Sequence, residues 1–166
     1  MKLIKDAEFG GECPLFASHD LHIDHVVIRE GESAIKECSN IMATNCRFEG
    51  NYPFWHVHGF VIKDCYFAVG GRSALWYCDH LQMMNTRVDA PKMFREMYDI
   101  DINNVELNDA DEVFWRCNKL HLKNLKLHGV LEVGKNCFYR LLARSEMNWQ
   151  ILQLFSFVDL AIRQVC

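Results

Sequence analysis

The chain has 166 residues, of which 50% are hydrophobic and 24% are charged, so it is long enough and apolar enough to bury one core. Its formal net charge is −4 at pH 7 and it contains no basic run, which argues against nucleic acid and against an anionic membrane surface as partners. No uninterrupted apolar segment reaches the roughly 18 residues that a membrane-spanning helix needs. We therefore expect one globular domain without a membrane or nucleic-acid partner.

Eight cysteines are spread along the chain, and none of them forms a CxxC pair of the kind found in zinc sites. Met1 to Gly10 contains two lysines and lacks the apolar segment of a signal peptide, so a reducing cytoplasm is the expected compartment. Unpaired cysteine behaves as a small core hydrophobe. We expect free, buried thiols, no metal and no cofactor.

The dominant pattern is an octet of residues that recurs at steps of 19 to 21 residues. Its copies begin at Leu21, Ile41, Phe60, Leu81, Ile100 and Leu120. The first, third and eighth positions are apolar with few exceptions, and the first and third alternate with polar positions as in a half-buried strand. Such regular spacing is typical of a repeat architecture.

The fifth position of the octet carries residues that suit a sharp corner. These residues are His25, Asn45, Asp64, Asn85, Asn104 and Asn124. Asn and Asp tolerate the left-handed backbone region, and stacked amides can hydrogen-bond from one copy to the next. Each octet is therefore predicted to form two short strands that meet at a corner, with this column as a structural ladder.

A further strand signal precedes each octet, and a loop of variable composition separates it from the octet before. One column of these segments is apolar, with Leu15, Ile35, Phe54, Leu75, Phe94 and Phe114. Another column is small or flexible, with Ser18, Cys38, Val57, Cys78, Met97 and Cys117. Three short strands per unit of about 20 residues match one coil of a parallel β-helix.

The predicted fold class is all-β, a right-handed parallel β-helix of about seven coils over residues 1–136. Successive coils would stack about 4.8 Å apart, with like side chains above like. A unit this short leaves too little chain for a helix in every crossover, which argues against a leucine-rich horseshoe or a doubly wound sheet. The remaining alternative is a β-sandwich with coincidental spacing.

Several phrases, together with the octet, carry a resemblance to a known family. They are Phe9–Ser18, Ala74–Tyr77, Asp89–Lys92 and Val113–Cys117. The region from about Phe9 to Gly129 resembles an uncharacterised bacterial family of pectin-lyase-like right-handed β-helix proteins, some of which carry an automatic hydrogenase label. The resemblance implies the coil architecture and brings no catalytic residues. A hydrogenase site needs clustered thiolates, whereas most thiols here fall in columns that predict burial, so we reject that activity.

Residues 137–166 depart from the repeat. An apolar stripe at helical spacing runs through Met147, Ile151, Leu154, Phe155, Val158 and Ile162. We expect an amphipathic helix that caps the open end of the coils, because an uncovered end exposes strand edges and core side chains. The alternative is a truncated or altered end whose apolar surface drives homo-oligomerisation.

A column of aromatic and basic residues lies beside the apolar column of the strands that precede the octets. Its members are Phe16, Lys36, Trp55, Trp76, Arg95 and Trp115. If the apolar column points inward, this column points outward, onto the face that forms the sugar-binding groove in β-helix proteins resembling the pectin lyases. Trp rings stack on sugar rings, and Lys or Arg can hold a uronate carboxylate. The candidate ligand-binding groove is therefore Lys36, Trp55, Trp76, Arg95 and Trp115, with a glycan as the favoured partner.

The orientation of Trp115 is ambiguous at this level. Strict alternation from Phe114 cannot also bury Cys117, which lies three residues further along. Either a bulge or corner intervenes, or Trp115 points inward as core. Outward-facing aromatics that merely fill shape, with cations lying along them, are the simpler interpretation of the column.

Catalytic and metal sites are weakly supported. Glu37 and Glu96 lie three coils apart, about 14 Å by strand spacing, whereas a glycosidase pair needs about 5 to 10 Å. The side chains of His22, Asp24 and His25 diverge in the repeat frame, so a zinc site is not expected. We expect a non-catalytic binding or interaction module; a carbohydrate-active enzyme and a structural self-associating protein are the alternatives.

Overall fold

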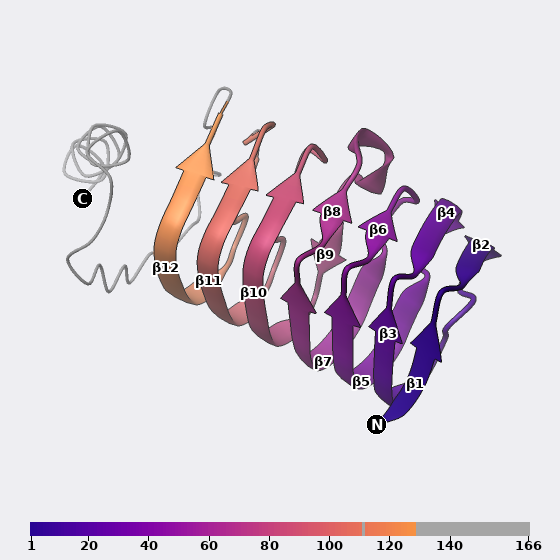
Figure 1. Ribbon diagram of the computed structural model, residues 1–166. Helices are drawn as coiled ribbons and strands as arrows, with labels where there is room; N and C mark the ends of the chain where they lie inside the picture. The colour runs from indigo at the N-terminus through magenta and orange to yellow at the C-terminus, as the bar shows by residue number, and fades with distance from the viewer. Residues whose placement is uncertain (111, 129–166) are drawn as a thin grey trace, which may run out of the picture.

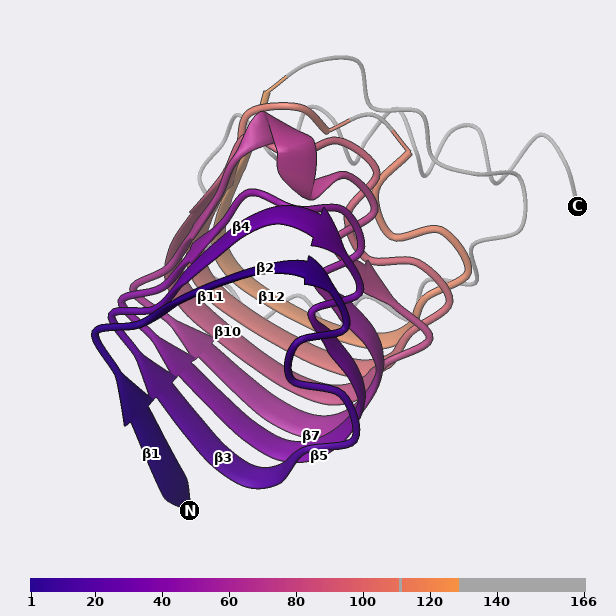
Figure 2. The same ribbon diagram turned by 90° about the vertical axis from the view of Figure 1, so that its right-hand side faces the viewer.

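The computed structural model describes residues 1–110 and 112–128, which form an all-β solenoid of about six turns. The predicted parallel β-helix is confirmed. Figure 2 looks along the stack from its N-terminal end, and the chain turns clockwise as it recedes, so the coil is right-handed. The expected boundary at residue 136, the C-terminal helix and the oligomerisation surface proposed for the tail all lie outside the described residues.

One side of the solenoid is a parallel stack of strands that runs along the whole axis (Figure 1). These strands are β1 (Lys2–Lys5), β3 (His19–Asp24), β5 (Ile35–Thr44), β7 (Phe54–Lys63), β10 (Asp79–Val88), β11 (Tyr98–Leu107) and β12 (Asn118–Leu127). Each strand pairs in register with the next, so equivalent positions of the octets lie directly above one another.

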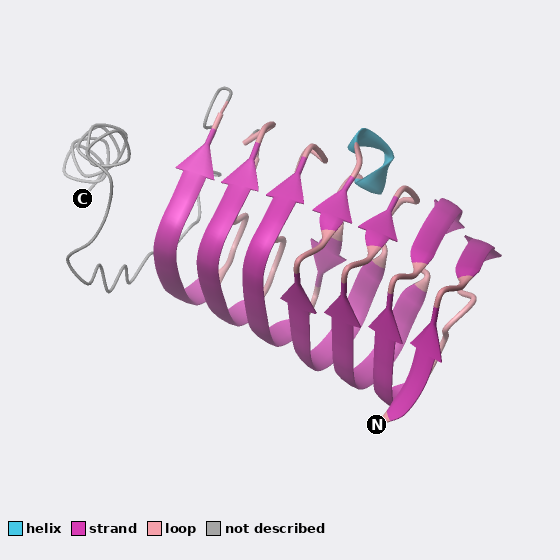
Figure 3. Cartoon of the chain, viewed as in Figure 1, coloured by secondary structure: helices cyan, strands magenta, loops and turns pink. Residues whose placement is uncertain are grey.

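The second side holds the ends of the octets, and the third holds the strands that precede them. The second side contains β2 (Glu8–Glu12), β4 (Val27–Glu32), β6 (Arg47–Phe48) and β8 (Tyr66–Phe67), followed by the far ends of β10 to β12. On the third side, β9 (Leu75–Trp76) pairs with the start of β7. Strands dominate the described residues, and the helical element among them is the short 3-10 turn η1 (Val69–Gly71; Figure 3). None of the helices found there is long and apolar enough to cross a membrane.

The corner column has the predicted left-handed backbone, whereas its predicted amide ladder is only partly formed. All six fifth-position residues have φ between 49° and 56°, in the left-handed region. Amide hydrogen bonds run along the column from Asn85 to Asp64 (3.0 Å) and from Asn104 to Asn85 (2.9 Å). The amides of Asn45 and Asn124 instead reach the fourth position of the octet before, at Asp24 and Asn103. The ladder is therefore continuous only over the middle turns.

The sixth position of the octet is a core column that the alternation rule does not predict. Its residues Val26, Cys46, Cys65, Thr86, Val105 and Leu125 are all buried. A left-handed residue at position five turns the chain, so positions three and six both face the interior although they are an odd number of residues apart. The core thus receives four side chains from each octet, at positions one, three, six and eight.

Inside the tube, like side chains stack on like. The rings of Phe48 and Phe67 lie 4.6 Å apart and nearly parallel, and those of Phe94 and Phe114 lie 4.9 Å apart. Among the described cysteines all six are free, and five of them are buried in these columns. Burial raises the pKa of the Cys78 thiol to about 12, so this thiol stays protonated in the core.

The corner column gives a test of what holds the turns. Replacing Asn104 by Ala removes an amide hydrogen bond. It also places at φ 56° a residue that has a Cβ atom but no polar side chain to hydrogen-bond the local backbone. We expect the free energy of unfolding, measured by urea denaturation, to fall by about 1–2 kcal/mol. Asn104→Gly should lose less, because glycine adopts positive φ without strain. Asp101→Ala, at an exposed position of β11 outside the corner, is the control. Equal losses in the Ala and Gly variants would contradict the backbone explanation.

Candidate functional site

The five residues predicted to form a groove lie in one continuous column on the outer surface. Lys36 is paired with Trp55 and Trp55 with Trp76 in strands β5, β7 and β9. Single bridges continue the column from Trp76 to Arg95 and from Arg95 to Trp115. Their neighbours Ile35, Phe54, Leu75, Phe94 and Phe114 are buried, whereas the five are half-buried. We call Lys36, Trp55, Trp76, Arg95 and Trp115 the aromatic–cation ladder.

Trp115 faces outward, and a corner explains how. Phe114 and Cys117 are both buried, with 5% and 0% of their surfaces exposed. Phe114 and Arg116 have φ of 56° and 50°, so the backbone turns on both sides of Trp115 and breaks strict alternation. The corner that alternation required is therefore present, and the interpretation of Trp115 as core is wrong.

The ladder stacks on itself. The rings of Trp55 and Trp76 are 5.1 Å apart at 35°, and the Lys36 ammonium lies 5.6 Å from the Trp55 ring. The Arg95 guanidinium lies between two indoles, 5.2 Å from Trp76 and 5.3 Å from Trp115. Ladder neighbours therefore lie over the faces of Trp55 and Trp76, so a sugar would not find an open face on either indole. Each cation–π contact is worth about 0.5–1 kcal/mol at such partly exposed positions.

Two tyrosines that the repeat pattern did not single out complete the aromatic surface. Tyr52 lies 5.4 Å from Trp55 and 5.9 Å from Trp76. Tyr77 stacks on Trp76 at 5.4 Å and 19°, and 40% of its surface is exposed. Both have positive φ, 48° and 54°, a conformation that is uncommon for bulky side chains. Alternation alone does not predict their position, because each occupies a left-handed corner.

An acidic residue fixes the cation in the ladder. Arg95 Nη1 donates a hydrogen bond to Glu112 Oε2 at 3.0 Å, and Lys92 Nζ lies 3.1 Å from the same oxygen. Hydrogen bonds from Lys92 and Arg95 hold the pKa of the Glu112 carboxyl below its usual value of 4.5. Glu112 is therefore ionised at neutral pH, and it holds one end of the Arg95 guanidinium.

Two donors on adjacent rungs of the ladder have no partner. Within residues 1–110 and 112–128, the buried side-chain nitrogens Trp76 Nε1 and Arg95 Nε make no hydrogen bond. An unsatisfied buried donor costs about 1–3 kcal/mol, so such groups are few in folded proteins. Both are N–H groups, and the missing partner is therefore an acceptor, such as the oxygen of a carboxylate, a hydroxyl or water.

Comparison with known families places the chain. Residues 2–137, most of its length, match the family described as Protein of unknown function (DUF3737). The chain belongs to this family. No curated protein matches it. The match supports the resemblance to an uncharacterised family and does not bear on the pectin-lyase-like likeness or the hydrogenase label.

A polar cluster of this DUF3737 chain at His22, Asp24 and Thr44 does not have the geometry of a nucleophilic site. The Thr44 hydroxyl lies 2.8 Å from His22 Nε2 and 2.9 Å from Asp24 Oδ1. In a catalytic triad the carboxylate binds the second ring nitrogen of the histidine, whereas here Asp24 binds the hydroxyl. Lys5, His25 and Asn45 also contact Asp24, so this cluster serves the corner.

Histidine and acidic side chains contact one another on the outer surface as ion pairs. His56 pairs with Glu37 at 3.2 Å, while His58 pairs with Asp79 at 2.7 Å. In the part of the chain that the structure describes, no three His, Cys, Asp or Glu side chains gather in a way that would hold a metal ion. Among the described surfaces, the aromatic–cation ladder therefore has the residue types best suited to binding a ligand.

The Glu112 carboxylate makes stability depend on pH. Its folded-state pKa is lowered, so the stabilisation is present above the unfolded pKa of about 4.5 and is lost as the pH falls through the folded pKa. We expect Glu112→Gln to lower the free energy of unfolding near neutral pH, and the deficit to shrink as the pH falls below about 4.5. Urea denaturation at a series of pH values measures this difference. Glu12→Gln, which removes an exposed carboxylate from β2, controls for the lost charge; a deficit that stays constant to acidic pH would contradict the ion pair.

Proposed function

We propose that the protein is a non-catalytic binding module whose aromatic–cation ladder holds an acidic glycan. The ligand we infer carries carboxylates, as uronate sugars do, and lies along the outside of the solenoid across several turns. The observation that carries this proposal is the pair of unpartnered donors, Trp76 Nε1–H and Arg95 Nε–H, on adjacent rungs. A carboxylate oxygen is an acceptor that both a guanidinium and an indole N–H bind.

Charge supports an acidic rather than a neutral ligand. Arg95 and Lys36 are cations within the ladder, and Arg116 lies 5.8 Å from the Trp115 ring at one end of it. Adjacent turns lie about 4.8 Å apart, so Lys36 and Arg95 are separated by about 14 Å along the axis. Two cations at this separation suit a chain that carries more than one carboxylate.

The stacked rings restrict how the sugar is held. Because ladder neighbours cover the indole faces, sugar C–H groups would contact ring edges and the exposed ring of Tyr77. The two donors are buried, so the ligand must displace a neighbouring side chain to reach them. Tyr77 stacks on Trp76 and is the exposed ring beside it, which makes it the side chain expected to move. We therefore expect modest affinity per sugar and affinity that falls with added salt.

Placement of the acids supports binding without turnover. Glu37 pairs with His56, and Glu96 lies 3.8 Å from Arg116. Glu37 and Glu96 are three turns apart along the stack. Glu112 already binds Lys92 and Arg95. An inverting or retaining glycosidase needs two carboxyl groups within about 10 Å of each other across one bond, whereas Glu37 and Glu96 are about 14 Å apart along the stack and Glu112 is engaged by two cations.

The donor argument is tested by two matched substitutions. Trp76→Phe keeps an aromatic rung and removes the unpartnered N–H, whereas Trp55→Phe removes an indole N–H that is not one of the unpartnered donors. In calorimetric titration of the whole chain with oligogalacturonate, we expect Trp76→Phe to weaken binding about tenfold and Trp55→Phe to weaken it much less. Lys36→Gln should reduce the salt dependence.

A neutral glucan of the same length is the control ligand, and thermal unfolding of each variant shows whether the ladder is intact. If the parent protein binds no uronate-bearing glycan, in titration or on a glycan array, the proposal fails. If the two Trp→Phe substitutions weaken binding equally, the glycan still binds the ladder, but the unpartnered donors have no special role. Reducing-end release, or formation of unsaturated uronate, would identify an enzyme instead.

A further inference from the structure

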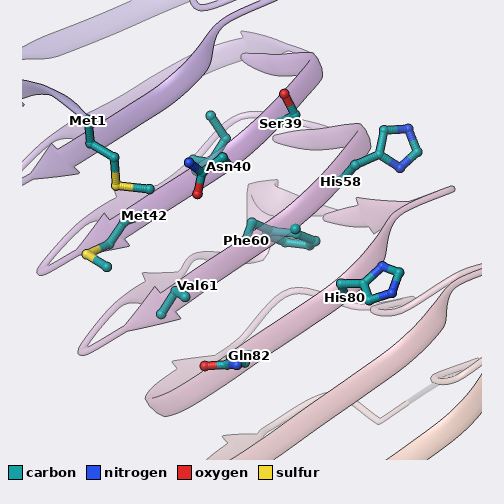
Figure 4. A pocket seen from close by; sticks show the side chains of 11 residues that line it. Met1, Ser39, Asn40, Met42, His58, Phe60, Val61, His80 and Gln82 are labelled. Atoms are coloured by element: carbon teal, nitrogen blue, oxygen red, sulfur yellow. The ribbon is translucent and has the colours of Figure 1, made fainter.

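A groove of about 490 Å³ lies on the outer face of β5, β7 and β10, on a different side of the solenoid from the ladder (Figure 4). Its lining includes Asn40, Met42, Gly59, Val61, His80 and Gln82. Figure 4 shows these residues arranged across the three strands, with Asn40 and Met42 on β5, Val61 on β7, and His80 and Gln82 on β10. No ladder residue lines this groove.

The groove exists because one rung of a surface column has no side chain. The residue just before each octet has positive φ and points outward; this column contains Asp20, Asn40, Gly59, His80, Asp99 and Lys119. A Cβ atom added at Gly59, where φ is +64°, would meet no atom within 4 Å. Gly59 therefore leaves open space between the side chains of Asn40 and His80.

On either side of this gap the column is linked by hydrogen bonds and ion pairs. Asn40 Nδ2 donates to Asp20 Oδ1, and Lys119 Nζ donates to Asp99 Oδ2 at 2.8 Å. With turns about 4.8 Å apart, the backbones at Asn40 and His80 are separated by about 9.6 Å. A planar group needs about 3.5–4.0 Å to the atoms above and below it, so the gap holds one planar group as a replacement rung.

An acceptor and one carboxylate lie close to the gap. Because the Asn40 amide nitrogen is used by Asp20, its carbonyl oxygen is the atom left to accept from a ligand. His58 Nδ1 and His80 Nδ1 both bind the Asp79 carboxylate, at 2.7 and 2.8 Å. Desolvation raises the pKa of Asp79, but the hydrogen bonds from His80 and His58 outweigh it and lower the pKa, so Asp79 is ionised.

The remaining charges near the groove lie further from the gap. Asp20 is one turn beyond Asn40 in the column, and its pKa is lowered by the hydrogen bonds from Asn40 and His19 and by the positive amino group of Met1. Lys119 is paired with Asp99. Met42 and Val61 supply an apolar wall beside these polar groups. The combination is an apolar wall beside the Asn40 carbonyl oxygen, with the ionised Asp79 next to the lining residue His80.

We propose that this groove binds a planar guanidinium group carried on a short apolar stem. The guanidinium takes the place of the missing rung at Gly59, stacks between Asn40 and His80, and donates hydrogen bonds to acceptors of the rim. Its methylene stem lies against Met42 and Val61. Guanidinium fits better than ammonium, because it is planar, weakly hydrated and able to stack. The group belongs either to an arginine side chain of a peptide or to a free guanidino compound.

The experiment is a titration of the isotope-labelled full chain, followed by NMR, with N-acetyl-L-arginine amide, N-acetyl-L-lysine amide and agmatine. We expect saturable shifts at His58, Gly59, His80 and Gln82 with the arginine probe or agmatine, and at least tenfold weaker binding of the lysine probe. The arginine probe alone points to a peptide arginine, and agmatine alone points to a free guanidino compound. Failure of both probes to saturate overturns the proposal.

Gly59→Asn is the decisive variant, because asparagine tolerates the left-handed backbone and fills the empty rung as Asn40 fills its own. We expect this variant to lose guanidinium binding at least tenfold while its thermal midpoint stays within a few degrees of the parent. Unchanged binding in Gly59→Asn overturns the proposal. If Gly59→Asn is unstable, two substitutions at Gln82, an exposed position of β10, replace it. Gln82→Glu should tighten guanidinium binding and Gln82→Lys should weaken it. The opposite order overturns the proposal.

Trp76→Phe should bind the guanidinium probes as the parent does, so this result is independent of glycan binding.

Discussion

The solenoid depends on residues that accept a left-handed backbone at its corners. Each turn has such residues at several places, and many of them are Asn, Asp, His or even aromatic residues rather than glycine. A left-handed residue reverses the alternation of side chains, so two positions an odd number apart can both face the core. Without these corners the octet would run on as a flat strand with its sixth position in solvent. The buried columns, and the outward direction of the ladder, follow from this one backbone constraint.

Parallel stacking in register then converts a column of the sequence into a ladder in space. The same 4.8 Å repeat that places phenylalanine on phenylalanine in the core places cations on aromatic rings outside it. Arg95 lies between two tryptophans, and on the second side Arg47 lies 4.6 Å from the Tyr66 ring. Such ladders form wherever neighbouring turns offer compatible side chains, so stacking by itself is not evidence of function. The informative positions are those where a ladder leaves something incomplete.

The octets were sufficient to predict the fold class and the left-handed corners, because both rest on a periodicity that the chain repeats at every turn. The segments before the octets predicted the aromatic column but left the direction of Trp115 open. Details that depend on broken periodicity were missed or left open. The burial of Thr86 and the positions of Tyr52 and Tyr77 require knowing which corners are left-handed. Covered indole faces at Trp55 and Trp76 follow from ring distances that a sequence does not contain. The groove at Gly59 arises from one absent side chain, which in the sequence is simply a glycine before an octet.

The described part of the solenoid departs from complete stacking at two places. In a solenoid the stability is approximately a sum over turns and the interfaces between them, so the other turns can compensate for a local cost at one rung. The two unpartnered donors, Trp76 Nε1 and Arg95 Nε, are such a cost. At Gly59 the missing side chain gives up a contact that side chains of the same column make on neighbouring turns. A structural ladder would be completed at either place by an ordinary substitution: phenylalanine for Trp76, or asparagine for Gly59. The two departures also differ in their chemistry, since the first offers donors beside cations and the second offers the Asn40 carbonyl oxygen near the Asp79 carboxylate. Opposite complementarity on two sides of one rigid coil is what separate ligands of opposite charge would require.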